Sequence, residues 1–307
     1  MYRGRVSRPG LEGGAALVDG EVVPIASARI PILDFGFTRS DCTYDVVAVW
    51  EGAFFRLDDH LDRFERSCRA LHLSLPHTRE EIVAILMELI RATGLREAYV
   101  EVICTRGVPP AGVRDPRQFV NRFYAFAIPY VWILRPEEGE RGMDAIVSRV
   151  VQRIAPTSVD PRVKNFHWGD LTRAMYEAFD RDARYPILLD ARGSVTEGPG
   201  FNVFALVDGA LLTPAAGVLE GITRKTVLEL AAREGIETAV VDLREEQLRS
   251  AAEIFASSTA GGIMPVTTLD GAAVGAGGVG PVTELIRTRY WEAHSDPAYA
   301  TPVDYDA

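Results

Sequence analysis

Only two lysines stand among the 33 basic residues of this 307-residue chain, Lys164 in VKNFHWGD and Lys225 in GITRKTV. Arginine stays protonated and cannot form an imine with a carbonyl compound, so these two residues are the only side chains that offer a primary amine. A lysine partly desolvated by aromatic neighbours has a lowered pKa and can form a Schiff base. Lys164 has such neighbours in Phe166 and Trp168, although a surface lysine would give the same string.

Two further strings are typical of anion binding. In GITRKTVLEL, Gly221 lets a ligand approach the backbone, and Thr223 suits the N-cap of a helix whose free N–H groups would face that ligand. In SSTAGGIM, Ser258 and Thr259 precede a Gly-Gly turn that can form a nest of backbone donors. A plain capped helix and a tight turn would look the same, so neither string decides the matter alone.

Two charged residues complete a possible set. Glu197 leads into the Gly-Pro-Gly turn of TEGPGFN, where a carboxylate is either solvated or held inward. Arg63 lies among apolar positions of DDHLDRFERS and either snorkels or binds a phosphate, with Arg56 as a rival. A Schiff-base lysine, a carboxylate for a pyridine nitrogen, a helix N-terminus with hydroxyls and an arginine are together what a pyridoxal 5'-phosphate site requires.

These residues must be positioned by elements of mixed type. AALVDGEVVPI predicts a β-hairpin, and Thr78 begins a helix with a capping box that Gly94 ends. Strands and helices follow one another without a strict βα alternation, which favours an α+β fold over a doubly wound sheet. The charged stretch LRPEEGERG separates a small N-terminal α/β domain, residues 1–134, from a larger domain, residues 135–307, that carries Lys164.

Composition narrows the class of protein. The formal net charge of −10 disfavours binding to nucleic acid, and no apolar run has the length of a membrane span. The N-terminus lacks the apolar core of a signal peptide. The three cysteines form no CxxC pair, which argues against a disulfide framework or a metal site. We therefore expect a cytoplasmic protein that acts on small molecules, without a metal, nucleic acid or membrane partner.

Longer strings make the chain resemble the fold type IV pyridoxal-phosphate enzymes, which include branched-chain aminotransferases, D-amino acid transaminases and aminodeoxychorismate lyases. FTRSDCTYDVV, FFRLDDHLDRFERS, VKNFHWGDL, TEGPGFN, GITRKTV and SSTAGGIMP together resemble the (R)-selective amine transaminases, in order over nearly the whole chain. The resemblance implies a larger C-terminal domain with barrel-like strands and a homodimer. It also implies transfer of an amino group from a primary (R)-amine or D-alanine to a keto acid such as pyruvate.

The resemblance further implies roles for single residues. Lys164 would form the Schiff base and then shuttle a proton at the substrate carbon, while Glu197 would keep the pyridine nitrogen protonated. The residues expected to hold the phosphate are Arg63, Ile222, Thr223 and Thr259. Lys225 lies behind this phosphate seat and is set aside as the Schiff-base residue.

A second group of positions matches the substrate pockets of the family. The residues that would line a large and a small pocket are Tyr44, Tyr99, Glu101, Trp168, Leu219 and Ser258, although core packing would also explain the aromatic ones. Arg114 matches a mobile arginine that grips the carboxylate of a keto acid and swings away for an apolar amine. Arg39 departs from the family, where His is common, and could bind a carboxylate, pair with Asp41 or have no role.

Two alternatives stay open at this point. A D-amino acid or branched-chain transaminase, or the lyase, would share the fold and the cofactor residues. A cofactor-binding protein without turnover belongs to another class, but the presence of both Lys164 and Glu197 argues against it.

Overall fold

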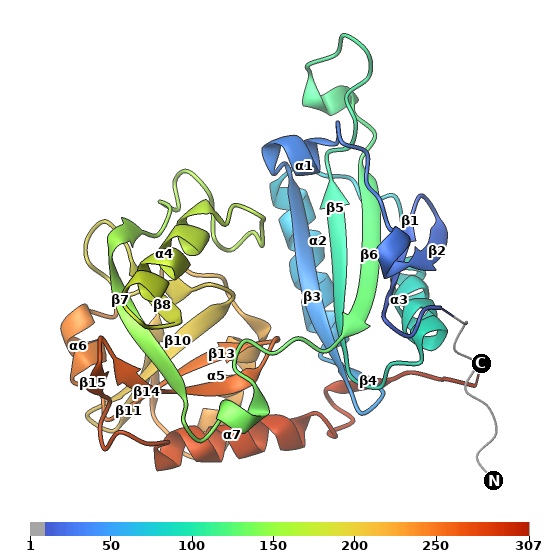
Figure 1. The fold of residues 1–307 in the computed structure, drawn as a ribbon. Helices are drawn as coiled ribbons and strands as arrows, with labels where there is room; N and C mark the ends of the chain where they lie inside the picture. The colour runs from blue at the N-terminus through green and yellow to red at the C-terminus, as the bar shows by residue number, and fades with distance from the viewer. Residues whose placement is uncertain (1–9, 307) are drawn as a thin grey trace. The chain divides into compact units, whose positions relative to one another are not determined.

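A computed structural model describes residues 10–306 and divides them into two units, which Figure 1 shows as ribbons. The second unit comprises Trp132–Arg162 and His167–Ala293, and the other described residues form the first. The short segment Val163–Phe166 therefore belongs to the first unit, because its contacts are mainly with residues of that unit. Lys164 goes with it, whereas the sequence predicts a single domain for the whole of residues 135–307.

The first unit is built on a seven-stranded sheet with the strand order β16-β4-β3-β5-β6-β1-β2. Every neighbouring pair in it is antiparallel. Its strands are β1 (Ala15–Val18), β2 (Glu21–Pro24), β3 (Cys42–Trp50), β4 (Ala53–Phe55), β5 (Ala98–Thr105), β6 (Arg122–Pro129) and β16 (Ala300–Pro302). Its α-helices are α1 (Phe35–Arg39), α2 (Leu57–Ala70) and α3 (Arg79–Thr93).

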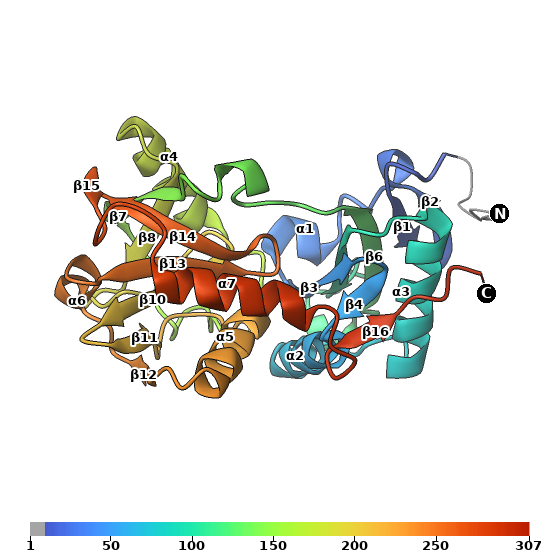
Figure 2. The same ribbon diagram turned by 90° about the horizontal axis from the view of Figure 1, so that it is seen from below.

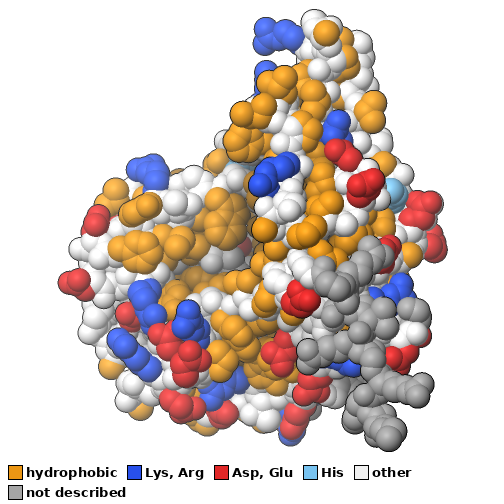
Figure 3. All heavy atoms as spheres, turned by 45° about the vertical axis from the view of Figure 1, so that its right-hand side comes forward, with side chains coloured by type: hydrophobic (Ala, Val, Ile, Leu, Met, Phe, Trp, Pro, Cys, Tyr) orange, Lys and Arg blue, Asp and Glu red, His pale blue; other side chains and the backbone are white. Residues whose placement is uncertain are grey.

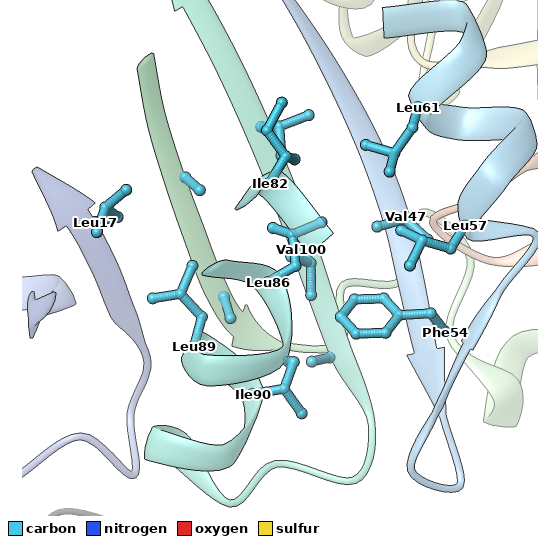
Figure 4. Packing of buried hydrophobic residues seen from close by; sticks show 14 of the residues in the cluster. Leu17, Val47, Phe54, Leu57, Leu61, Ile82, Leu86, Leu89, Ile90 and Val100 are labelled. Atoms are coloured by element: carbon cyan, nitrogen blue, oxygen red, sulfur yellow. The ribbon is translucent and has the colours of Figure 1, made fainter. Parts of the chain in front are cut away.

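Helices α2 and α3 cover one face of this sheet, and their apolar side chains form its core. Figure 4 shows Leu61 from α2 and Leu86 from α3 pointing towards Val47 and Val100 on the central strands. All four side chains are buried. Because side chains alternate across a strand, the residues between these core positions must lie on the other face of the sheet.

Local signals in the sequence are confirmed in this unit. AALVDGEVVPI forms the β1–β2 hairpin. At the start of α3 the hydroxyl of Thr78 accepts from the backbone N–H of Glu81, and the Glu81 carboxylate accepts from the N–H of Thr78. Gly94 ends the helix with φ 69°, a left-handed conformation that glycine adopts without steric cost.

The second unit is built on a nine-stranded mixed sheet. Its strands are β7 (Met143–Gln152), β8 (Tyr185–Leu189), β9 (Glu197–Gly198), β10 (Phe201–Val207), β11 (Ala210–Pro214), β12 (Thr238–Val241), β13 (Glu253–Ser258), β14 (Gly262–Leu269) and β15 (Ala272–Ala273). Its α-helices are α4 (Gly169–Asp180), α5 (Ile222–Arg233), α6 (Glu245–Arg249) and α7 (Pro281–Ala293). The main path runs β12-β11-β10-β13-β14-β7-β8, with β15 beside β14 and β9 beside β10.

One face of this second sheet packs on itself, as the inside of an open barrel does. Val147, Val203 and Ala256 come from three different strands and belong to one buried cluster. Neighbouring residues on the same strands point outward, where Ile146 packs against α4. Figure 2 shows α5 and α7 side by side along the sheet. The mixture of sheets and helices confirms the α+β fold and the barrel-like strands.

Two surface properties bear on the class of protein. No helix among residues 10–306 is both long and apolar enough to cross a membrane. On the face shown in Figure 3, acidic and basic side chains are interspersed, so the net charge of −10 is not gathered into one field there.

Candidate active site

The lysine segment is held at an open edge of the first sheet. Strand β4 pairs with β3 only at Val49 and Trp50, so among residues 10–306 no strand pairs with the beginning of β3 on that side. There the backbone N–H of Tyr44 donates to the carbonyl of Lys164 at 3.3 Å, and the hydroxyl of Thr43 donates to the same oxygen at 2.6 Å. These two bonds fix the position of Lys164 without using its side chain.

The side chain of Lys164 lies over an aromatic ring. Its Nζ is 4.4 Å from the centroid of the Tyr44 ring, a distance that permits a cation–π interaction. Phe166, two residues further along the chain, stacks on the Tyr44 ring with a centroid separation of 4.1 Å. Lys164 and Tyr44, which the sequence predicts in different roles, are thus brought together, with Phe166 as a support.

Tyr99 and Glu101 lie on the same face of this sheet as Tyr44. The hydroxyl of Tyr99 donates to Oε2 of Glu101 at 3.0 Å. Glu101 is 6% exposed, and burial raises its pKa to about 7 even though the Tyr99 hydrogen bond and the charge of Lys164 oppose the rise. This face therefore carries an amine, two phenols and a carboxyl group that titrates near neutral pH.

The other face carries a second buried carboxylate, Asp45, in a different environment. Arg63 on α2 donates to both oxygens of Asp45, from Nε at 2.7 Å and from Nη2 at 2.8 Å, and His60 Nδ1 lies 2.8 Å from Oδ1. Burial alone would raise the pKa of Asp45, but the charge and hydrogen bonds of Arg63 and His60 outweigh it and hold the pKa well below its usual range. Asp45 is therefore ionised throughout the ordinary pH range.

This pairing limits what Arg63 can do. One edge of its guanidinium, Nε and Nη2, donates to Asp45 and is not available to a phosphate. The phosphate role of Arg63 stays a prediction. The rival, Arg56, donates to Asp59 and lies over the ring of Tyr299.

The two other arginines expected at the substrate lie apart from this cluster. Arg39 is exposed and lies over the ring of Phe35, with its guanidinium carbon 3.9 Å from the centroid. Asp41, one of its possible partners, is instead bonded through both oxygens to Arg106. Arg114 is exposed in the loop after β5. Neither arginine is brought to Lys164 by a described hydrogen bond or ion pair.

In the second unit Glu197 is held inward. It is 6% exposed and accepts from Nε of Arg153 at 3.1 Å through one oxygen and from the N–H of Leu219 at 2.9 Å through the other. Arg153 also donates from Nη1 to Asp170 at 2.7 Å. Of the two interpretations of Glu197, the inward one is confirmed, because Arg153 and the backbone compensate its buried charge.

The N-terminus of α5 is close to Glu197, because both adjoin Asn202. Asn202 pairs with Glu197 in the β9–β10 register, and its side-chain nitrogen donates to the carbonyl of Leu219 at 2.9 Å. A Cβ atom on Gly221 would lie 2.1 Å from Oδ1 of Asn202, so a larger residue there would have to displace the Asn202 side chain. The first turn of α5 therefore starts directly beside the Glu197 turn.

The expected N-cap of α5 is wrong by two residues. Gly221, in an extended conformation, is the N-cap, and Thr223 is the second helical residue. Within the described part of the chain no side chain caps the first turn, and the N–H groups of a first turn have no partner inside the helix. Thr223 and Ile222 are buried at this end. Close packing of the backbone on Asn202, which the sequence does not display, moves the helix start to glycine.

The remaining expected residues of the second unit lie on neighbouring elements. Ser258 ends β13, and its hydroxyl donates to the carbonyl of Gly200 in the Glu197 turn at 2.7 Å. Half-buried Thr259 follows it. Trp168 precedes α4 and packs against the small apolar cluster beneath that helix. The second unit thus joins Glu197, Leu219, Ser258 and the α5 N-terminus. Trp168 adjoins the same turn, because a Cβ atom placed on Gly200 would lie 3.5 Å from Cη2 of Trp168.

Sequence reasoning missed several residues that organise these groups: Asp45, His60, Arg153, Asp170 and Asn202. For Asp45 a signal was present, because a carboxylate inside the apolar run TYDVVAVW needs a buried partner. The partners themselves are distant in sequence and carry no local signature.

Removing the charge of Asp45 tests its place in the first unit. We expect Asp45→Asn to lower the free energy of unfolding by about 3–5 kcal/mol, because Arg63 is left buried without a countercharge. The matched control is Asp58→Asn on the helix that carries Arg63. The Asp58 carboxylate is solvent-exposed and paired with Arg79, so its loss should cost less than about 1 kcal/mol. Denaturant unfolding measures both, and equal losses for the two variants would contradict the buried pairing.

Comparison with known proteins places this geometry in a family. The family model described as Amino-transferase class IV matches residues 43–269. A Methanocaldococcus jannaschii protein assigned as a branched-chain-amino-acid aminotransferase is 32% identical over 89% of this chain and 94% of its own. The D-alanine aminotransferase of Staphylococcus haemolyticus is 30% identical over 91% and 98%. The branched-chain amino acid aminotransferase of Thermobaculum terrenum in its PLP-form superposes with a TM-score of 0.85, at 25% identity, over 97% of this chain and 100% of that one. This chain belongs to the class IV aminotransferases.

Proposed function

We propose that the protein is a pyridoxal-phosphate-dependent (R)-selective amine transaminase that moves an amino group from a primary (R)-amine or D-alanine to a keto acid such as pyruvate. The observation that carries the proposal is the cluster on the first sheet. Lys164 offers its amine beside the Tyr44 ring, and the buried charged neighbour on that face is the carboxyl group of Glu101. A carboxyl group at this position is compatible with a donor amine that has no carboxylate, whereas it would repel the carboxylate of an amino acid donor when ionised.

The residues of the second unit fit the cofactor. The uncapped first turn of α5 offers backbone donors to a phosphate, and the close contact of Gly221 with Asn202 explains why no side chain fills that position. Glu197, held by Arg153 and the Leu219 N–H, is a buried carboxylate of the kind that pairs with a protonated ring nitrogen. When bound, pyridoxal phosphate supplies an aldehyde for amines and a ring that accepts the electrons of the substrate carbon.

Each residue then has a role. Lys164 supplies the primary amine, takes the proton from the substrate carbon at Nζ and later returns it. Glu197 holds a proton on the ring nitrogen. Phosphate contacts are assigned to the N–H groups of Ile222 and Thr223, to Thr259 and to Arg63. Lys225 is exposed on α5 and near Glu229, which supports setting it aside.

Substrate contacts are assigned on the same basis. Tyr44, Tyr99 and Glu101 share one sheet face, while Trp168, Leu219 and Ser258 belong to the second unit. Arg114 is assigned to the carboxylate of the keto acid. It is exposed, and within residues 10–306 its side chain has no hydrogen bond or ion pair that would hold it elsewhere. Arg39 lies on Phe35 instead of on Asp41, so a carboxylate could still draw it away from the ring.

A D-amino acid transaminase is the second candidate. The resemblance to the D-alanine aminotransferase of Staphylococcus haemolyticus over 91% of the chain favours it. It differs from the first candidate in requiring a carboxylate on the donor, so an unexposed cation would be needed near Lys164. Arg63 is committed to Asp45 and Arg106 to Asp41, which favours the amine transaminase.

We further propose a cytoplasmic homodimer. Cys42, Cys68 and Cys104 are all free and buried, which fits a reducing compartment. Exposed apolar side chains at Ile32, Leu33 and Phe37 would be covered by a second copy of the chain.

The chain itself offers a matched pair of variants for the role of Lys164. We expect Lys164→Ala to abolish turnover and the absorbance band that depends on the covalent bond between the cofactor and a lysine, because no other side chain at the site offers a primary amine. Lys225→Ala removes the only other lysine and should retain both properties. Absorbance spectra and steady-state rates decide, and turnover of Lys164→Ala at the wild-type rate would end the assignment.

Donor class is tested by the half-reaction. Protein loaded with pyridoxal phosphate is mixed with (R)-α-methylbenzylamine, with its (S)-enantiomer or with D-alanine, and the visible spectrum is followed. Fast bleaching by the (R)-amine and not by the (S)-amine is expected, since a large and a small pocket would accept the two substituents of the amine in one arrangement only. Bleaching by D-alanine alone would favour the D-amino acid transaminase, and equal rates for the two enantiomers would contradict (R)-selectivity.

A further inference from the structure

Glu101 lies in the middle of β5, where its nearest neighbours on the same sheet face are apolar or phenolic. In the antiparallel register it lies opposite Val46 of β3 and Phe126 of β6, so these three side chains share one face. Tyr99 lies on the same face two residues before it. Within residues 10–306 the side chain of Glu101 has a single hydrogen bond, from the Tyr99 hydroxyl, and no ion pair.

The charged and titratable groups around Glu101 come from several elements. Tyr99 lies on the same strand. On β3, Tyr44 lies on the same face of the sheet and Asp45 on the opposite face. Tyr124 lies on β6, and Lys164 lies at the sheet edge. Asp45 is satisfied by Arg63 and His60, and the Tyr124 hydroxyl donates to Asp34. Arg63 and His60 are thus bonded to Asp45, and Lys164 is the cation among these residues that has no such bond to a carboxylate within residues 10–306.

These surroundings make the charge of Glu101 sensitive to pH. Burial raises the pKa of Glu101 to about 7, the Tyr99 hydrogen bond and the charge of Lys164 lower it, and the charge of Asp45 raises it. An ordinary glutamate is ionised at neutral pH, whereas both forms of Glu101 are populated there. Its hydrogen-bond partner is a donor, so the ionised form keeps one bond and the neutral form can itself donate.

We propose that the protonation state of Glu101 selects the class of substrate: neutral Glu101 admits substrates that carry a carboxylate, and ionised Glu101 favours amines that lack one. This inference rests on the proposed function. A neutral carboxylic acid donates a hydrogen bond to a substrate carboxylate. An ionised one repels it, and in a buried site little water screens that repulsion. Glu101 is thus a specificity-determining residue, and Arg114 need not be the sole group that distinguishes the two substrates.

The direct test compares two donors of matched shape. D-alanine and (R)-sec-butylamine differ in having a carboxylate or an ethyl group at the same position, and both lack aromatic bulk. For wild-type protein, kcat/KM for D-alanine relative to the amine should fall at least about tenfold from about pH 6 to about pH 8.5, as Glu101 ionises. In Glu101→Gln, which cannot ionise, the ratio should be nearly independent of pH.

A control and a second measurement separate selection from general effects. Glu97→Gln changes an exposed glutamate just before the same strand and should behave as wild type. The second measurement uses protein without cofactor. Because the pKa of Glu101 is raised in the folded state from 4.5, the native form binds the proton more tightly, so stability falls as pH rises from about 4.5 to about 7. Glu101→Gln should lack this fall in melting temperature.

The possible outcomes are distinguishable. A pH-dependent ratio in wild type and in Glu97→Gln, lost in Glu101→Gln, would support the inference. If Glu101→Gln shows the same pH-dependent ratio as wild type, or if the wild-type ratio is flat while both donors react, the inference is wrong and the proposed function stands. If neither donor reacts with the loaded protein, both are wrong.

Discussion

The two hydrogen bonds by which the backbone N–H of Tyr44 and the hydroxyl of Thr43 hold the carbonyl of Lys164 are the constraint on which the candidate site depends. The beginning of β3 has an unpaired edge, and an unpaired edge offers backbone donors and acceptors to any segment that lies along it. Residues 163–166 take that place, so the amine of Lys164 is positioned by a sheet and not by a loop alone. With the backbone of Lys164 fixed, the contact of its Nζ with the ring of Tyr44 is enough to orient the side chain.

Two carboxyl groups on the same sheet have different pKa values because their surroundings differ. Asp45 and Glu101 lie on adjacent strands but on opposite faces. Asp45 faces α2, where Arg63 and His60 keep it ionised, and so it anchors the helix. Glu101 faces Tyr44 and Tyr99, has no paired cation among the described residues, and titrates near neutral pH. Two acids of similar strength in water thus become a structural anion and a group whose charge can change during use.

Local features of the fold could be predicted from the sequence because they depend on neighbouring residues. The β1–β2 hairpin, the Thr78 capping box and the Gly94 helix end need only a few consecutive side chains, and all are confirmed. The lysine and the motif strings were recognisable for the same reason. The start of α5 was not, because a tertiary contact of Gly221 with Asn202 decides it. Likewise, the pairing of Arg63 with Asp45 and of Arg153 with Glu197 joins residues 18 and 44 positions apart.

We propose that Lys164 is the amine that holds the cofactor, and this is directly measurable because the chain contains only two lysines. Protein loaded with pyridoxal phosphate is reduced with sodium borohydride, digested, and mapped by mass spectrometry. We expect a phosphopyridoxyl group on the peptide that contains Lys164 and none on the peptide that contains Lys225. A modified Lys225, or an unmodified Lys164 in protein that binds the cofactor, would contradict this proposal.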